Sequence, residues 1–216
     1  MARFFTAIVL IVSTLFPIVN PLGGAPIFLA LTREASRPQR KTLAWGVARN
    51  SFFLLLGSLL IGSYILSFFG ISLPIVQVGG GLVLVSAGWA MLKREDDDER
   101  QAIGRSADPC LLMRRAFYPL TLPLTVGPGS IAAAITLGAN APQPGGGRLA
   151  LGLLAAVLGA LLLSLCVFLC YGFADRTVTL LGPTATRVMM RLTAFLLLCI
   201  GLQIVWNGVS ALVRTL

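Results

Sequence analysis

Residues 16–30 read FPIVNPLGGAPIFLA, and this stretch decides the class of fold. It lies inside a run without charged residues, 4–32, whose 29 residues are long enough to cross a bilayer, because about 20 apolar residues span the hydrocarbon core as a helix. The centre of the run holds Pro17, Asn20, Pro21 and a pair of glycines, all of which disfavour a continuous helix. We therefore expect a membrane-spanning helix that is interrupted near the middle of its length.

The composition of the whole chain is that of a membrane protein. Of its 216 residues, 56% are hydrophobic and 12% are charged, whereas about 25% of the residues of a soluble domain are charged. The other charge-free runs are 50–92, 116–147, 149–174 and 192–213. The first of these can hold two spans with a turn near Gly70. The sequence thus predicts an all-α integral membrane protein with six transmembrane helices.

Basic residues are unequally divided between the two sides of this predicted protein. With six spans, loops 32–42, 93–115 and 174–191 share one side and hold 13 Lys and Arg residues, against three on the other side. Because cytoplasmic loops retain Lys and Arg, we expect both termini to face outward. The same placement accounts for the formal net charge of +9, so that the expected partner is the lipid bilayer and not nucleic acid.

Two segments have simple interpretations. The acidic stretch 95–99 lacks the glycine turn and the ligand spacing of a calcium loop, so we interpret it as solvated and predict no metal site. The N-terminal segment 1–16 resembles a signal peptide, but no small-x-small cleavage site follows it. We expect it to be an uncleaved first span.

A second interrupted span follows at residues 117–131, which read FYPLTLPLTVGPGSI. Three prolines recur at an offset of 102 residues, in the pairs Pro17 and Pro119, Pro21 and Pro123, and Pro26 and Pro128. A period of about half the chain indicates duplication. We predict two three-helix repeats, 1–92 and 115–216, joined by a charged cytoplasmic loop, 93–114. Since three is odd, the second repeat is inverted, and the first and fourth helices are broken at mid-membrane.

Inverted repeats with broken helices in corresponding positions are typical of the substrate site of a transporter. Free N–H groups where a half-helix begins, at Pro26 and at Pro128, can bind a carboxylate, and free carbonyl groups before each break can hold an ammonium group. The predicted substrate-binding residues are Asn20, Pro21, Gly23, Gly24, Thr125, Gly127, Gly129 and Ser130. None of them is ionised, so we expect a small substrate without a charged side chain, such as a zwitterion.

Three other polar residues within the spans are accessory candidates. Arg49 lies close enough to the cytoplasmic end to extend its side chain to the surface, and it is a candidate gate or carboxylate partner. Gln77 and Gln203 lie in the third and sixth spans and are either equivalent site residues or hydrogen-bond partners between helices. The triple glycine 79–81 is interpreted as a helix-packing surface.

Residues 16–32, FPIVNPLGGAPIFLALT, and residues 119–135, PLTLPLTVGPGSIAAAI, together resemble the MarC family of bacterial inner-membrane proteins. The resemblance covers essentially the whole chain. It implies the inverted six-span fold of the lysine-exporter superfamily, a place in the bacterial inner membrane, and, from some members, transport of neutral amino acids of glycine or alanine size. In that membrane the distribution of Lys and Arg predicts that both termini are periplasmic. The resemblance also implies that the broken-helix centre is formed by Asn20, Pro21, Gly23, Gly127, Pro128 and Gly129.

Other classes of function are weighed against this one. A thiol-redox carrier needs a cysteine in each broken helix, and neither 16–30 nor 117–131 contains one. An enzyme is not expected, because the chain has no His and its spans hold no Asp or Glu. A membrane channel or a structural membrane protein stays open as the alternative. The sequence predicts no cofactor, and it leaves the coupling ion (H+ or Na+), the direction of transport and homo-oligomer formation open.

Overall fold

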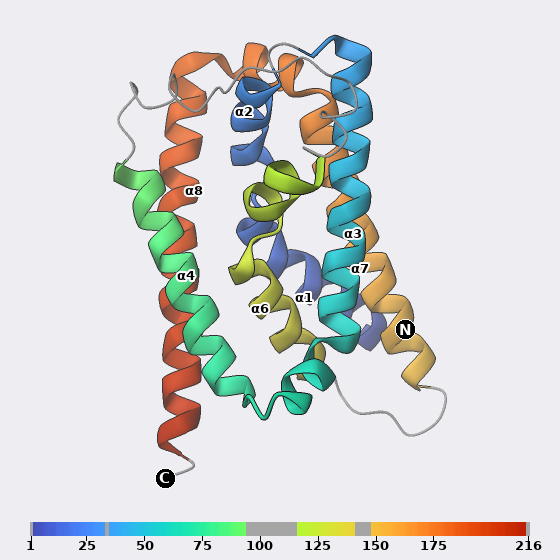
Figure 1. The fold of residues 1–216 in the computed structure, drawn as a ribbon, viewed down its shortest axis with the longest axis vertical. Coiled ribbons are helices and arrows are strands. Elements are labelled where there is room, and N and C mark those ends of the chain that lie inside the picture. Colours follow the sequence, from blue (N-terminus) through green and yellow to red (C-terminus); the bar gives the residue numbers. More distant parts are fainter. Residues whose placement is uncertain (1, 33–34, 94–115, 141–147, 215–216) are drawn as a thin grey trace.

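The structure is a computed structural model, and it describes residues 2–32, 35–93, 116–140 and 148–214. These residues are almost entirely helical (Figure 1). In chain order the elements are α1 (Ala2–Val19), α2 (Pro21–Leu31), α3 (Arg37–Phe68), α4 (Leu73–Lys93), the π-helix η2 (Ala116–Thr125), α6 (Pro128–Ala139), α7 (Arg148–Gly172) and α8 (Ala174–Val213). The predicted charged loop 93–114 lies outside the described residues, apart from Lys93 itself.

The prediction of an all-helical membrane protein is confirmed, with five to six candidate spans. Five segments of the described chain are long and apolar enough to cross a membrane: Phe4–Leu31, Arg37–Phe68, Leu73–Lys93, Ala150–Gly172 and Met190–Val213. The sixth candidate is formed by η2 and the short apolar helix α6. The predicted turn between the second and third spans is also present, where Gly70 takes a positive φ of 67° between α3 and α4.

The first span is broken at Asn20. This residue separates α1 from α2 with a left-handed backbone (φ 47°, ψ 60°), which asparagine adopts more readily than most residues. Its side-chain oxygen accepts a hydrogen bond of 3.0 Å from the N–H of Gly23 and so caps the new helix. Pro21 stands at the first helical position, where a missing N–H costs nothing. The prediction that the half-helix begins at Pro26 is therefore wrong: Pro26 lies inside α2.

The second break is longer and has a different form. Tyr118 and Leu122 have extended backbones within η2, and the chain leaves the helix again before Gly127. Gly127 precedes α6, and Pro128 occupies the first helical position, as the sequence predicts. Leu122 is 102 residues after Asn20, which is the offset that also relates the paired prolines. The two interruptions therefore correspond at this position and differ in form beyond it.

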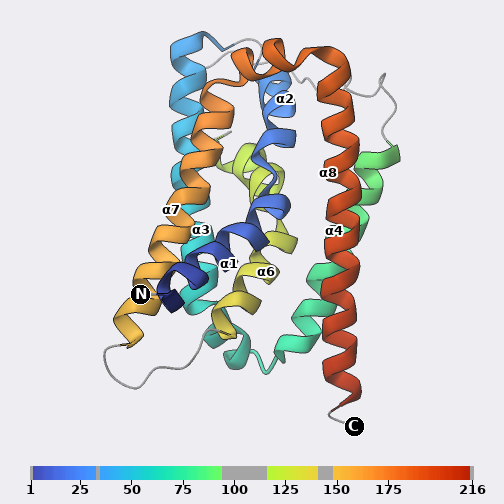
Figure 2. The same cartoon turned by 180° about the vertical axis from the view of Figure 1, so that it is seen from behind.

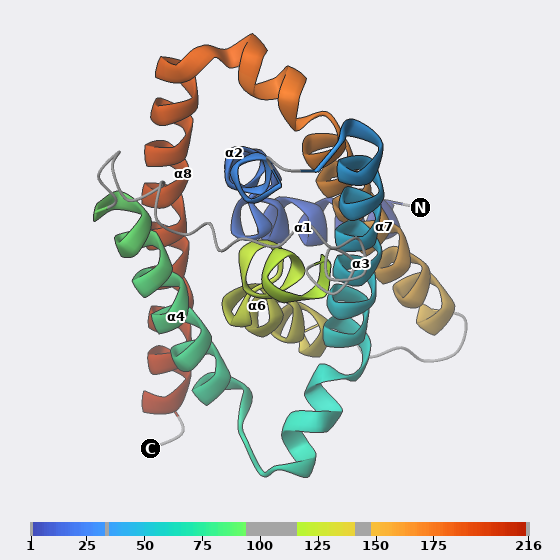
Figure 3. The same cartoon turned by 45° about the horizontal axis from the view of Figure 1, so that its top comes forward.

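The broken helices lie between two helix pairs. In Figures 1 and 2, α1, α2, η2 and α6 occupy the middle, with α3 and α7 paired on one side and α4 and α8 on the other. Figure 3 shows the first part of α8 crossing one end of the molecule before the long span begins, and Gly182 (φ 72°) interrupts α8 in this part. The end that carries the α2–α3 connection also carries the C-terminus of α4 and the α7–α8 junction.

Glycines bring α4 and α8 into close contact. A Cβ atom on Gly81 would lie 2.8 Å from the carbonyl oxygen of Gly201, and one on Gly88 would lie 2.8 Å from that of Ala194. Small residues at such positions let helix backbones approach each other, which drives packing where lipid removes the hydrophobic contribution. The packing interpretation of 79–81 is thus confirmed for two residues, since a side chain on Gly80 would collide with the methyl group of Ala132 in α6, while Gly79 faces open space.

Candidate functional site

Tyr171 of α7 connects the two breaks. Its side chain is completely buried, and its hydroxyl oxygen lies 2.9 Å from Oγ1 of Thr125 at the end of η2. Its ring stacks on Phe28 of α2, with the ring centroids 4.6 Å apart and the planes inclined by 18°. A Cβ atom on Gly24 would collide with the Tyr171 hydroxyl. One side chain therefore touches the half-helix of the first break and the last residue of η2 at the second.

Threonine hydroxyls stabilise the irregular segment η2. Oγ1 of Thr125 donates to the carbonyl of Leu120 at 2.7 Å, and Oγ1 of Thr121 donates to that of Ala116 at 2.5 Å. These hydroxyls donate to backbone carbonyls in a segment whose prolines have no N–H group to donate. Because a hydroxyl has one proton, Thr125 accepts its bond from Tyr171. Asn50 of α3 reaches the same segment, with 3.5 Å between its Nδ2 and Oγ1 of Thr121.

The N–H groups of the first break are less free than the sequence led us to expect. Pro21 has no N–H, that of Gly23 donates to the Asn20 side chain, and that of Gly24 donates to the Asn20 carbonyl at 2.9 Å. The left-handed turn at Asn20 is the cause, because it places both oxygens of this residue over the start of α2. A Cβ atom on Gly23 would collide with the Asn20 side chain. In this conformation the protein itself occupies the space beside both glycines.

At the N-terminus of α6, the N–H groups make fewer hydrogen bonds to the described residues than those of α2 do. Gly127 caps it without a side-chain hydrogen bond, and the hydroxyl of Ser130 donates back to the Gly127 carbonyl at 2.9 Å. Within the described part of the chain, the buried N–H groups of Gly129 and Ser130 have no hydrogen-bond acceptor. These groups carry the partial positive charge of a helix N-terminus, which favours an anion.

Apart from Arg40, the buried polar side chains of the described residues are hydroxyls. Among the described residues, the buried polar and charged side chains are Thr32, Arg40, Ser51, Thr121, Thr125, Ser130 and Ser164. The hydroxyls of Ser51 on α3 and Ser164 on α7 have no hydrogen-bond partner among the residues that the structure describes, although each is almost completely buried. A buried hydroxyl without a partner costs about 1–3 kcal/mol, so these two groups would gain from a polar ligand.

Within the described residues, none of the three accessory candidates forms a hydrogen bond to the residues at the breaks. Arg49 is exposed, and no hydrogen bond or ion pair joins it to the described residues. Gln77 is half-buried beside Gly208 of α8. The exposed Gln203 donates from Nε2 to Oδ1 of Asn207 at 3.0 Å, which is a bond along its own helix and not to a neighbouring one.

Sequence reasoning missed Tyr171, Ser51 and Ser164. Each is a hydroxyl-bearing residue in an otherwise apolar span, and that is the only signal that could have indicated it. Hydroxyls are common in membrane helices, where they often bond to their own backbone, as Ser58 does to the carbonyl of Leu54 at 2.7 Å. The signal therefore does not separate a site residue from an ordinary one.

The fold and the site define a polytopic helical membrane protein whose broken helices enclose uncharged hydrogen-bonding groups. Residues 5–213 match the family described as MarC family integral membrane protein, and the chain belongs to that family. It is 30% identical over 204 residues to the UPF0056 membrane protein MJ1677 of Methanocaldococcus jannaschii, covering 93% of this chain and 95% of the relative. It is 28% identical over 221 residues to the UPF0056 inner membrane protein MarC of Salmonella typhimurium, covering 100% and 99%. No solved structure matches the chain.

Proposed function

We propose that the protein is a secondary transporter of the bacterial inner membrane that carries small neutral amino acids, of glycine or alanine size, by alternating access around the two breaks. The observation that carries this proposal is the contact of Tyr171 with both breaks, in a region whose buried polar groups are uncharged. A zwitterion suits such a region. Its carboxylate would accept from the free N–H groups of Gly129 and Ser130, and its small side chain would need no ionic partner.

The packing of the helices supports the inverted-repeat part of the proposal. α1 packs against α7 as η2 packs against α3, and α2 packs against α8 as α6 packs against α4. These are the contacts that a twofold relation between residues 1–92 and 115–216 would make equivalent. Transporters with such repeats bind substrate where the broken helices meet and move one part of the fold against the other.

The sizes of the neighbouring side chains support a small substrate. Tyr171 fills the space beside Gly24, and the side chain of Leu84 of α4 fills the space that a Cβ atom on Gly129 would need. The ring of Phe28 stacks on that of Tyr171. A long substrate side chain beside either glycine would have to displace these residues further than a methyl group would.

Ligand binding to the purified protein tests the choice of substrate. We expect glycine and alanine at a hundred times their Kd to stabilise the protein in detergent by about 2.7 kcal/mol, and so to raise its Tm. Lysine and glutamate should have no effect. The Thr125→Val variant serves as the site variant and should lose the shift. The proposal would be contradicted if only charged amino acids raised the Tm. It would also be contradicted if no neutral amino acid raised the Tm at up to about 100 mM.

A further inference from the structure

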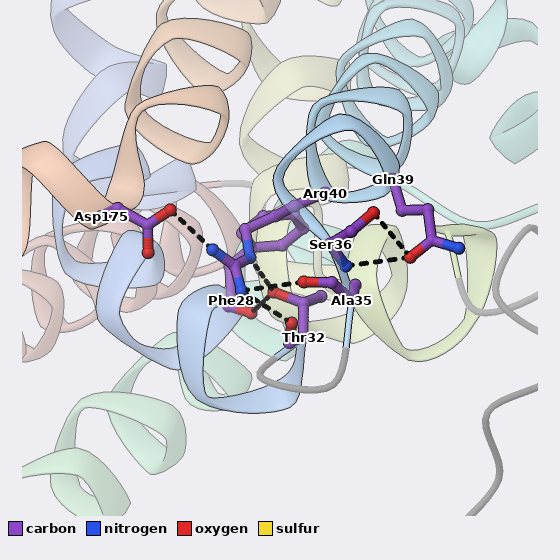
Figure 4. A network of polar contacts seen from close by, with 7 residues as sticks. All are labelled: Phe28, Thr32, Ala35, Ser36, Gln39, Arg40 and Asp175. Carbon is purple, nitrogen blue, oxygen red and sulfur yellow. Dashed lines mark hydrogen bonds and ion pairs between the residues drawn. The ribbon is translucent and has the colours of Figure 1, made fainter.

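Arg40, in the first turn of α3, is buried at the end of the molecule that carries the α2–α3 connection (Figure 4). Its Nη1 donates to Oδ2 of Asp175 at 2.6 Å; 10% of the Arg40 side chain is exposed, against 38% of that of Asp175. Asp175 belongs to the first turn of α8. The neighbouring cations Arg37 and Lys41 are exposed, so burial singles out Arg40 on this helix.

The same guanidinium group also holds the C-terminus of α2. Its Nη2 donates to the carbonyl of Thr32 at 3.0 Å and to that of Ala35 at 3.2 Å, and its Nε donates to Oγ1 of Thr32 at 3.2 Å. The Thr32 hydroxyl in turn donates to the carbonyl of Phe28 at 2.7 Å (Figure 4). A cation is favourable at a helix C-terminus and an anion in a first turn. Arg40 therefore joins two helix ends of complementary charge, the end of α2 and the beginning of α8.

This network leads directly to the site. Phe28, whose carbonyl ends the chain of hydrogen bonds, stacks on Tyr171, and Tyr171 bonds to Thr125. At its other end α2 is joined to α1 through the single non-helical residue Asn20. α2 thus has a one-residue joint at the break and a set of polar contacts at its far end.

We propose that the Arg40–Asp175 ion pair is a latch that holds α2 against α8 and closes this end of the molecule, and that opening it lets α2 turn about Asn20 and exposes the site. Arg40 is a positioning residue in this scheme, since it acts on the site through α2. An ion pair that is partly withdrawn from water, as this one is on its Arg40 side, is a weak source of stability compared with apolar packing, and the best-attested use of such a pair is in specifying or switching a state. The latch rests on the proposed transport function, in which this end opens to admit the substrate.

Cysteine accessibility tests the latch without any transport measurement. In a protein whose native cysteines are replaced, Ala25→Cys places a thiol on the completely buried face of α2. We expect Asp175→Asn to raise about tenfold the rate at which a water-soluble maleimide labels this thiol in detergent. This corresponds to a loss of about 1.4 kcal/mol in the stability of the closed state relative to the open one. Asp175→Glu keeps the charge and should restore slow labelling. Arg37→Gln changes the charge at the same end by the same magnitude with the opposite sign, and it should leave the rate unchanged.

An unchanged labelling rate in Asp175→Asn, with a normal gel-filtration profile, would overturn the latch and leave the pair a structural contact. Asp175→Asn keeps the bonds of Arg40 to Thr32 and Ala35, so the test does not depend on a variant that removes the cap of α2. The readout is the same whether or not the protein carries amino acids. Failure of the latch is therefore distinguishable from failure of the proposed substrate.

Discussion

At Asn20 the chain takes a left-handed backbone that costs most residues about 1–2 kcal/mol, and the asparagine side chain repays part of this cost by capping α2. Among the described non-glycine residues, Asn20 alone has a positive φ. Tyr171 faces this break from α7 and binds the second break through Thr125. Two polar side chains, each with a defined partner, thus give the interrupted stretches a single conformation.

The bond between Tyr171 and Thr125 can be measured with a double-mutant cycle. Tyr171→Phe keeps the ring on Phe28 and should cost about 0.5–1.5 kcal/mol. Thr125→Val should cost more, about 1–3 kcal/mol, because it leaves the Tyr171 hydroxyl and the Leu120 carbonyl without their bonds. The double variant should lose less than the sum, as measured by thermal unfolding in detergent. Strict additivity would show that the two hydroxyls are not coupled.

Among the elements, the short helices and the long ones have different roles. α2 is an 11-residue helix that depends on its ends, capped by Asn20 at one and by Arg40 at the other. α4 and α8 instead rest on continuous packing, in which Gly81, Gly88 and Gly201 bring the backbones together. We infer that α2 is the element that moves, because hydrogen bonds hold both of its ends, and that the α4–α8 pair moves as one body.

Two neighbouring glycines test the packing of α4. Gly81→Ala places a Cβ atom 2.7 Å from Cγ2 of Val205 and 2.8 Å from the carbonyl of Gly201, and it should destabilise the protein by about 1–3 kcal/mol. The Cβ atom that Gly79→Ala adds has nothing within 4 Å. This substitution should therefore be neutral or stabilise the protein by about 0.5–1 kcal/mol, because alanine has the higher helix propensity. Thermal unfolding of the two variants gives the comparison. Equal effects would mean that α4 and α8 are not in close contact.

The molecule as a whole places its helix connections at two ends. The end with the latch also carries the C-terminus of α4 and the α7–α8 junction, and the opposite end carries the α3–α4 turn and the C-terminus of the chain (Figure 1). This division agrees with the one used to count basic residues, 13 against three. We therefore propose that the latch closes the cytoplasmic end and that both termini face the periplasm.

Reporter fusions test this orientation. Alkaline phosphatase, which is active only outside the cytoplasm, should be active when fused after Leu216 and inactive when inserted in the loop 93–114. The reason is the retention of Lys and Arg on the cytoplasmic side. A cytoplasmic fluorescent reporter at the same two sites is the matched control and should give the opposite result. Phosphatase activity in the loop alone would reverse the orientation and place the latch at the periplasmic end.

Much of this fold could be predicted from the sequence, since hydrophobic runs and charge distribution determine the class of a membrane protein directly. The position of the first break was predictable from the cluster around Asn20, but not its form, because proline at residue 26 is compatible with both the start and the interior of a helix. The role of Gly24 was also not predictable: the sequence indicates that something lies close to it, and the structure places Tyr171, 147 residues later, there. Arg40 was counted only as one of the basic residues of the loop 32–42, because its partner Asp175 is 135 residues away in the sequence.

Alanine counterflow in proteoliposomes tests most directly whether the two breaks form a substrate site. We expect saturable counterflow with the wild type and with Ser67→Ala, an exposed serine of α3 that bonds to its own helix and serves as the control. At matched protein levels, Thr125→Val should lower alanine affinity about five- to thirtyfold, the equivalent of about 1–2 kcal/mol for one hydrogen bond within the membrane. Wild-type counterflow in this variant would show that the substrate passes elsewhere, and voltage-driven current at channel rates in place of counterflow would show that the protein is a pore.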